Sequence, residues 1–348
     1  MIHPIPNGTR DVLPDETREL RRITDALRTV FERHGYGEVV TPALEYESEL
    51  ARGDMRDVFG RAGYGEVYTP ALEYESVITR GELDALRPAY RVFDENGNVL
   101  VLRSDMTVPI ARVVATRYPT AEPPLRFCYF AHSYRGVRPQ RGQPREFLQA
   151  GLELIGASSP LGTAEAVTVL CRALDAAGLA RYRVGLGDAK LYPALLDSLG
   201  VAAAERTRLL DELARGDFVG LERGLRELAI DDDSIDLLLA VPQMRGGADV
   251  LHGPAGPVAD AVAGLRAVHD LLESDVAARV IFDLGLSRAP GYYTGAVFEV
   301  YDPALGMPLG GGGRYDNLLG EFGRSLPAVG FALEVDRLHL ALAAEERL

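Results

Sequence analysis

Cysteine and histidine are scarce in this sequence, and their spacing indicates no metal site. The 348 residues include two cysteines, Cys128 and Cys171, and six scattered histidines. Two cysteines without a CxxC pair exclude a disulfide framework and the usual zinc spacing. Because no HxH or HExxH pair occurs either, we expect no metal and no other cofactor. Both cysteines lie in apolar segments, so we expect buried thiols in a reducing compartment.

Positive charge and long apolar runs are also lacking. The 37 lysines and arginines are outnumbered by 51 acidic residues, which gives a formal net charge of −14. Such a charge argues against extended contact with nucleic acid phosphates. No apolar run reaches membrane-spanning length, and the amino-terminal MIHPIPNGTRDVLPDE is too polar and proline-broken for a signal peptide. We therefore expect a soluble cytoplasmic protein without membrane contact.

Hydrophobic residues are plentiful, at 47%, and favour a folded chain with a sizeable core. The length suggests about two domains. Near the amino terminus, the helical spacing of apolar residues predicts a helix over 16–33, with Asp15 as its cap and Gly35 at its end.

A near-identical internal duplication follows this predicted helix. FERHGYGEVVTPALEYES (31–48) returns as FGRAGYGEVYTPALEYES (59–76), offset by 28 residues, with three of the eighteen positions changed. Two copies are too few for a solenoid, which needs at least three. We expect one copy to take the native strand and the other, with 49–61, to form an extra loop or hairpin. The sequence leaves open which copy does so.

The rest of the chain alternates between predicted strands and helices. An Asn-Gly turn at Asn96-Gly97 predicts a hairpin over 90–103, and a helix is predicted after Ser104 and Asp105. The acidic, Leu- and Ala-rich stretch 189–278 is interpreted as a helical insertion domain, and 1–188 with 279–348 as the main domain. The other predicted elements are a helix over 163–177, strands over 125–134, 148–154, 181–188, 278–285 and 291–301, and a closing strand and helix from 326.

The stretch 125–156, LRFCYFAHSYRGVRPQRGQPREFLQAGLELIG, reads as strand, loop and strand. Its second arm alternates between an apolar face and the polar or small face of Gln149, Gly151 and Glu153, as a surface strand also would. The loop holds four arginines, which are Arg135, Arg138, Arg141 and Arg145. Clustered guanidinium groups repel one another unless water or an anion compensates them. We therefore favour a site for a small ligand that carries an anionic end and hydrogen-bonding groups.

Several polar residues fall on segments that otherwise look buried. They are Asp105, Gln149, Glu153, Arg288, Tyr292 and Tyr293. Buried charge is costly unless it is paired, so each needs a neighbour or a ligand. Taken singly, each is typical of a satisfied structural residue; together they would fit a zwitterionic amino acid with a polar side chain. The glycines 310–313 lack the Lys-Ser/Thr of a phosphate loop and favour close backbone packing instead.

Four ordered motifs resemble class II histidyl-tRNA synthetases. They are GYGEVxTPALE, RPQRGQPREFLQAGLELIG, GYYTGAVFE, and GGGRYDNLL followed by PAVGFAL. The resemblance covers nearly the whole chain. It implies an α+β fold, in which an antiparallel sheet is flanked by helices, and dimerisation through the motif around Pro42 or Pro70.

Two branches of this family share that fold. One is the synthetase; the other is the regulatory subunit of ATP phosphoribosyltransferase, which does not aminoacylate and partners a short catalytic chain in the first step of histidine biosynthesis. A synthetase would need a further anticodon-binding domain of roughly a hundred residues, whereas this chain ends eleven residues after Arg337. The resemblance also implies that the nucleotide-binding side of the site has lost family residues. A glutamate, an arginine and a glycine of the synthetases are replaced by Val137, Gln143 and Glu334. A carboxylate at Glu334 would repel phosphates.

The resemblance implies a residual anion or nucleotide side and a retained histidine side. The anion or nucleotide side keeps Arg135, Arg145 and Arg337, so weak ATP binding is left open. On the second, the α-ammonium would be held by Asp105, Thr107 and Gln149. The imidazole would be held by Glu153 and Tyr293, while Arg288 would face the carboxylate and Tyr292 would line the pocket. Ala-Pro-Gly replaces the Gly-Leu-Asp that synthetases carry before Tyr292, which alters the pocket.

We therefore expect a non-catalytic regulatory subunit. Its partners would be a short-form ATP phosphoribosyltransferase catalytic subunit and L-histidine as effector, with a homodimer inside a hetero-oligomer. The alternative is a synthetase-like enzyme that activates an amino acid with ATP. A tRNA- or protein-binding module is a third reading, and the negative charge disfavours tRNA.

Overall fold

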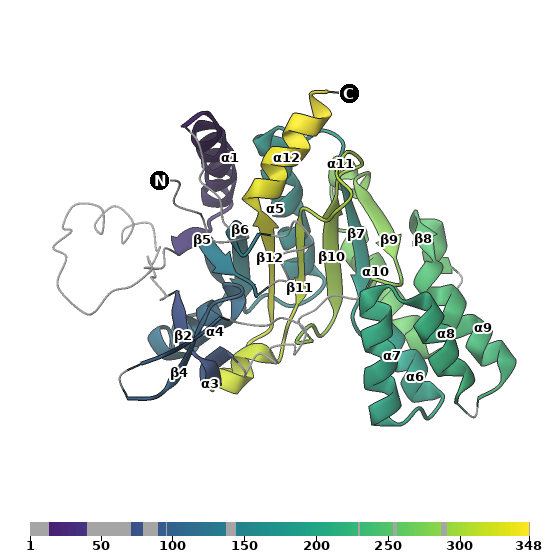
Figure 1. The fold of residues 1–348 in the computed structure, drawn as a ribbon. Helices are drawn as coiled ribbons and strands as arrows, with labels where there is room; N and C mark the ends of the chain where they lie inside the picture. The colour runs from purple at the N-terminus through teal and green to yellow at the C-terminus, as the bar shows by residue number, and fades with distance from the viewer. Residues whose placement is uncertain are drawn as a thin grey trace, which may run out of the picture.

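A nine-stranded sheet forms the centre of the fold (Figure 1). The computed structural model describes residues 14–39, 71–78, 90–94, 96–136, 144–228, 230–252, 256–286 and 291–347. Among them the strand order is β1-β5-β6-β12-β11-β10-β7-β9-β8. These strands are β1 (Gly37–Val39), β5 (Leu125–Tyr134), β6 (Glu146–Ile155), β7 (Arg183–Asp188), β8 (Arg245–Gly246), β9 (Val280–Asp283), β10 (Ala296–Tyr301), β11 (Gly310–Arg314) and β12 (Ala328–Glu334).

Most neighbouring strands are antiparallel, which confirms the predicted sheet. The parallel pairs are β1 with β5 and β7 with β9, near the two ends of the sheet. One face is covered by α1 (Pro14–Arg33), α5 (Leu161–Ala177) and α12 (Val335–Glu345). Leu152 and Leu154 of β6 are fully buried in that core, together with the predicted buried thiols Cys128 and Cys171. The alternating residues of β6 thus lie on the two opposite faces of the sheet.

The opposite face carries the second buried cluster. It is covered by α4 (Thr107–Arg117) and the 3₁₀ helix η6 (Leu318–Phe322), with Tyr129, Met106 and Tyr315 buried between them and the sheet. The register pairs Gly151 with Tyr129 and with Ala332, so these residues share this face. Gln149 and Glu153, two residues away on either side, face the same way because side chains alternate along a strand. The polar residues of β6 therefore lie under α4 rather than in the large apolar core.

A small sheet positions the start of α4. It has the order β2-β4-β3, formed by β2 (Leu72–Tyr74), β4 (Val99–Leu102) and β3 (Arg91–Phe93). The predicted hairpin is confirmed, and Gly97 adopts a left-handed φ of 79° in its turn. The buried Glu73 accepts a hydrogen bond from Arg112 Nη2 of α4 at 2.5 Å. This ion pair ties α4 to the small sheet.

Both copies of the duplicated sequence contribute strands among the described residues. The first supplies β1 to the large sheet, where it pairs with β5. The second supplies β2 to the small sheet, where it pairs with β4. Residues 40–70 lie outside the described residues. Among the described residues, each copy thus contributes one strand.

The stretch 189–278 is mainly helical and gathers at the β8 end of the sheet (Figure 1). Its α-helices are α6 (Leu191–Ser198), α7 (Ala203–Arg215), α8 (Phe218–Arg226), α9 (Asp232–Ala240), α10 (Ala259–His269) and α11 (Ser274–Ala277). Its strand β8 joins the large sheet beside β9. Buried Leu209 and Leu238 of this stretch belong to the same continuous core as Val184 of β7.

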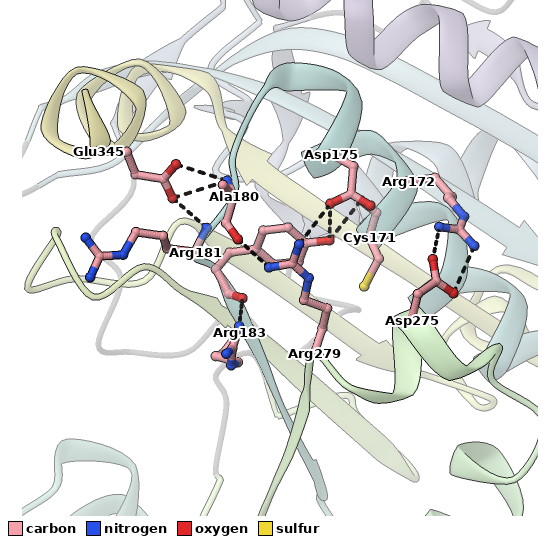
Figure 2. Close-up of polar contacts among 10 residues, drawn as sticks. Cys171, Arg172, Asp175, Ala180, Arg181, Arg183, Asp275, Arg279 and Glu345 are labelled. Atoms are coloured by element: carbon pink, nitrogen blue, oxygen red, sulfur yellow. Dashed lines mark hydrogen bonds and ion pairs between the residues drawn. The ribbon is translucent and has the colours of Figure 1, made fainter. Parts of the chain in front are cut away.

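Polar contacts hold α11 beside α5, and α12 beside the start of β7 (Figure 2). Arg172 Nη1 of α5 donates to Asp275 Oδ2 of α11 at 2.5 Å. Glu345 of α12 accepts hydrogen bonds from the backbone N–H groups of Ala180 and Arg181, just before β7. The two contacts hold α11 and α12 against the α5–β7 corner.

Close backbone packing explains the glycine run in β11. Gly312 pairs with Phe331 of β12, and a Cβ at 312 would lie 2.7 Å from the Phe331 Cα and collide with the Gly330 carbonyl. A side chain there has no room, which confirms the predicted packing role.

Candidate functional site

Glu153 is the buried centre of the candidate site. Its side chain points from β6 toward α4 and is 1% exposed. Thr107 Oγ1 donates a hydrogen bond to Glu153 Oε1 at 2.7 Å, and the Tyr315 hydroxyl donates to Oε2. Gly330 lies opposite Glu153 on β12, and a side chain there would collide with the carboxyl group. The sequence thus leaves space for one carboxyl group and supplies two hydroxyl donors to it.

The electrostatics of the site favour a neutral Glu153. Burial raises the pKa of Glu153 from 4.5 to about 8, although hydrogen bonds from Tyr315 and Thr107 act in the opposite direction. The negative charge of Asp105 raises this pKa further. Burial therefore favours the protonated form of Glu153 near neutral pH. An ammonium or imidazole group brought beside it would favour the charged form.

Aromatic rings build the wall around this carboxyl group. The Tyr292 ring centroid lies 5.1 Å from that of Tyr293 and 5.7 Å from that of Tyr315. Burial raises the pKa of Tyr129, Tyr292 and Tyr315 well above 10, so their hydroxyl groups stay neutral. Gly313 leaves space for Tyr293, because a Cβ at 313 would lie 2.8 Å from the Tyr293 Cδ1. Neutral hydroxyl groups and rings suit a small, planar, hydrogen-bonding ligand.

Asp105 and Gln149 lie at two further points of the site. Asp105 Oδ1 accepts a hydrogen bond from the Val108 N–H of α4 at 3.3 Å. Its negative charge raises the pKa of both Glu153 and Tyr292, so it acts on the same cluster of side chains. Gln149 is buried, and its Oε1 accepts a hydrogen bond from Ser133 Oγ at 2.8 Å.

The structure therefore brings together five of the predicted histidine-site residues. Asp105, Thr107, Tyr292 and Tyr293 lie around Glu153, and Gln149 lies farther along the same face of β6. Thr107 contacts the Glu153 carboxyl group directly. The predicted carboxylate ligand Arg288 lies outside the described residues.

Sequence reasoning missed three residues that build this site. They are Tyr129, Ser133 and Tyr315. Tyr315 had a signal, because it stands in the GGGRYDNLL motif, and strand alternation places Tyr129 and Ser133 on one face of β5. Nothing in the sequence paired Ser133 with Gln149, because that contact depends on the β5–β6 register.

The predicted anion side is occupied by a carboxylate of the chain itself. Arg135 Nη2 lies 2.6 Å from Glu334 Oε1, and Arg337 Nε lies 2.8 Å from Glu334 Oε2. The Arg145 carbonyl accepts a hydrogen bond from the Arg135 N–H at 2.9 Å. Glu334 thus forms ion pairs with two of the three predicted arginines. The predicted substitutions at Val137 and Gln143 fall outside the described residues.

The described residues show neither a group suited to a metal ion nor a helix suited to span a membrane. They contain no group of three or more His, Cys, Asp or Glu side chains that could hold a metal ion. None of their helices combines the length and apolarity that crossing a membrane requires.

The fold and the cluster of side chains around Glu153 have the features of a histidyl-tRNA synthetase-like protein of class II. The family model described as histidyl-tRNA synthetase matches residues 8–57 and 48–338. This chain belongs to the histidyl-tRNA synthetase family. The two matched ranges overlap at 48–57, within the region of the duplication.

Curated relatives place the chain more narrowly, in the regulatory branch. The ATP phosphoribosyltransferase regulatory subunit of Symbiobacterium thermophilum is 40% identical over 99% of this chain and 82% of its own length. The protein of the same name from Desulforamulus reducens is 36% identical over 96% of this chain and 78% of its own length.

Solved structures of the same family have a similar fold. An ATP phosphoribosyltransferase regulatory subunit/histidyl-tRNA synthetase from Bacillus halodurans has a TM-score of 0.83 and 31% identity, covering 98% of this chain and 84% of that one. A histidine–tRNA ligase subunit from Alicyclobacillus acidocaldarius has a TM-score of 0.77 and 30% identity, covering 99% of both chains. The synthetase-like alternative is not favoured by the curated relatives.

Proposed function

We propose that this chain is the regulatory subunit of an ATP phosphoribosyltransferase. It would assemble with a short catalytic subunit and act in the first step of histidine biosynthesis. The observation that carries the proposal is the 40% identity, over nearly the full chain, to a relative named for this role. Cyclic dimers are the commonest oligomers, so the proposal includes an even number of copies. It also includes a cytoplasmic location.

The charge distribution supports a non-catalytic role. In a phosphoryl- or nucleotidyl-transferring site, free arginines stabilise phosphate charge. Here Arg135 and Arg337 both face the carboxylate of Glu334. The described partners of the Glu153 carboxyl group are instead hydroxyl groups, from Thr107 and Tyr315. This asymmetry is what an amino-acid sensor without catalysis requires.

L-histidine is the effector that this pocket suits best. Its imidazole would contact Glu153 and Tyr293, and its ammonium would lie near Asp105, Thr107 and Gln149. Arg288 remains the proposed partner of the ligand carboxylate. For histidine to inhibit the complex, it must bind one state of the assembly better than another, because only differential affinity shifts an equilibrium.

The first experiment is a phosphoribosyltransferase assay of a short-form catalytic chain, with and without this protein, followed by added L-histidine. We expect activation that histidine reverses. Histidine-dependent ATP–pyrophosphate exchange is measured on the same folded sample. Exchange without activation would overturn the proposal and favour the synthetase-like enzyme.

A second experiment tests the pocket by calorimetric titration with L-histidine. Glu153→Gln should weaken binding by about 1–3 kcal/mol, the scale of hydrogen bonds to charged groups. Glu165→Gln is the matched control. Glu165 also accepts two side-chain donors, from Tyr36 and Arg126, but it lies on α5 on the opposite face of the sheet. Equal histidine affinity in wild type and Glu153→Gln would show that this pocket is not the histidine site.

A further inference from the structure

A few contacts define the place that β2 fills in the small sheet, called here the β2 slot. The Ala71 carbonyl accepts a hydrogen bond from the Arg103 N–H at 2.9 Å, and β2 pairs along its whole length with β4. The buried Glu73 carboxylate accepts a hydrogen bond from Arg112 Nη2 of α4 at 2.5 Å. Backbone pairing and one buried ion pair therefore hold the strand in this slot.

The first copy of the duplication carries the same residues as the second copy that fills the slot. Residues 41–48 and 69–76 both read TPALEYES. Glu45 is therefore the counterpart of Glu73, in a segment with the same order of side chains on each face. The backbone groups that pair with β4 are also the same in the two copies. Either copy can thus make the contacts that define the slot.

The first copy also begins close to the slot. β1 ends at Val39, which pairs with Tyr129 of the parallel strand β5. Five residues further along β5, the Tyr134 N–H donates to the Arg103 carbonyl. Arg103 is in turn the residue whose N–H donates to Ala71. A chain that continues from β1 in the direction of β5 therefore runs toward the β2 slot.

The cost of closing the connecting chain does not single out one copy. Exchange of the copies would move 28 residues from the connection before the slot to the connection after it. Because loop-closure entropy grows only slowly with length, this move changes the cost little. The flanks differ more. The buried Ile78 of α3 (Glu75–Ile78) has Leu50 as its counterpart, and Val77 has the charged Glu49. This difference favours the second copy, which is the one in the slot.

We propose that the two copies compete for the β2 slot, so that the TPALEYES of the first copy can replace that of the second as the strand beside β4. The exchange keeps a carboxylate beside Arg112 and therefore keeps α4 anchored to the small sheet. It depends only on the duplicated sequence and the small sheet. The proposal therefore holds or fails whatever the phosphoribosyltransferase assay shows.

Charge reversal disables one copy at a time. Thermal melting is measured for wild type, Glu73→Lys, Glu45→Lys and the double variant. A lysine in the slot would face Arg112 and Arg103, whose charges both act on the Glu73 carboxylate. The double variant should therefore melt at least about 5 °C below wild type, or not fold. Glu73→Lys alone should lose less than half of that amount, because Glu45 then fills the slot. Glu45→Lys should melt like wild type.

Hydrogen exchange followed by mass spectrometry shows which copy is paired. The two TPALEYES peptides have the same mass in wild type, but either lysine substitution makes their masses differ. In Glu73→Lys we expect protected amides in 41–48 and free exchange in 69–76, because only the first copy then keeps its carboxylate. Glu45→Lys is the matched control and should show the reverse pattern.

Three results would overturn the proposal. In the first, Glu73→Lys melts as low as the double variant or does not fold, because the first copy has then failed to replace the second. In the second, residues 41–48 are no better protected in Glu73→Lys than in Glu45→Lys. In the third, the double variant melts like wild type, which would mean that the slot requires neither carboxylate.

Discussion

At the scale of single residues, Glu153 shows how burial changes the state of one carboxyl group. It accepts hydrogen bonds from Thr107 and Tyr315, which favour its charged form, yet burial outweighs them and raises its pKa to about 8. Glu334 lies on the same face of the sheet and forms ion pairs with two arginines. The two carboxyl groups therefore have different kinds of partner on one face of the sheet. Glu153 is surrounded by hydroxyl groups, and Glu334 is paired with two arginines.

Glu153 should make the chain less stable as the pH rises from about 5 to 8. Across that window the folded state keeps a proton that the unfolded state, with its ordinary pKa of 4.5, has already released. The free energy of unfolding then falls by up to about 1.4 kcal/mol per pH unit from this group. Glu153→Gln should remove this contribution, which urea unfolding at pH 5, 6, 7 and 8 would measure. An unchanged slope in the variant would show that Glu153 titrates normally.

At the scale of secondary-structure elements, the β11–β12 pair depends on the absence of side chains. Gly312→Ala should destabilise the fold by at least about 1–3 kcal/mol, because the new methyl group meets strand backbone that cannot move aside. Chemical unfolding would measure this change. Gly264→Ala is the matched control in α10, where a Cβ meets nothing within 4 Å. That variant should gain up to about 1 kcal/mol from helix propensity. Equal effects of the two substitutions would contradict the packing argument.

At the scale of the whole molecule, the duplication divides two strands between its copies. β1 comes from the first copy and β2 from the second. Deleting residues 40–67 would join Val39 to Tyr68 and restore one uninterrupted GYGEVYTPALEYES. We expect this variant to fold with equal or greater stability, because a shorter connection costs less chain entropy to close. Its melting temperature and its gel-filtration volume would check this. Aggregation or a clearly lower melting temperature would show that the extra residues are required.

The helical stretch 189–278 belongs to the same scale. Composition predicted a separate insertion domain, whereas the structure adds β8 to the main sheet and joins the cores through buried leucines. Composition cannot distinguish these arrangements, because apolar helix faces bury equally well against their own neighbours or against a sheet. The division into two domains stays a prediction.

The sequence by itself determined the elements and their faces. Apolar periodicity gave the helix ended by Gly35, the Asn96-Gly97 turn gave the hairpin, and alternation gave the two faces of β6. Local patterns suffice for such features, because helix period, turn chemistry and strand pleat each involve residues close in the chain. The ordered motifs also sufficed to predict the family.

Only the tertiary structure decided which residues meet. The contact of Glu334 with Arg135 spans 199 positions of the chain, and that of Tyr315 with Glu153 spans 162. Such pairs depend on the order and register of strands that are far apart in the sequence. The raised pKa of Glu153 also arises only in the fold, because it depends on how completely the surrounding elements remove that carboxyl group from water.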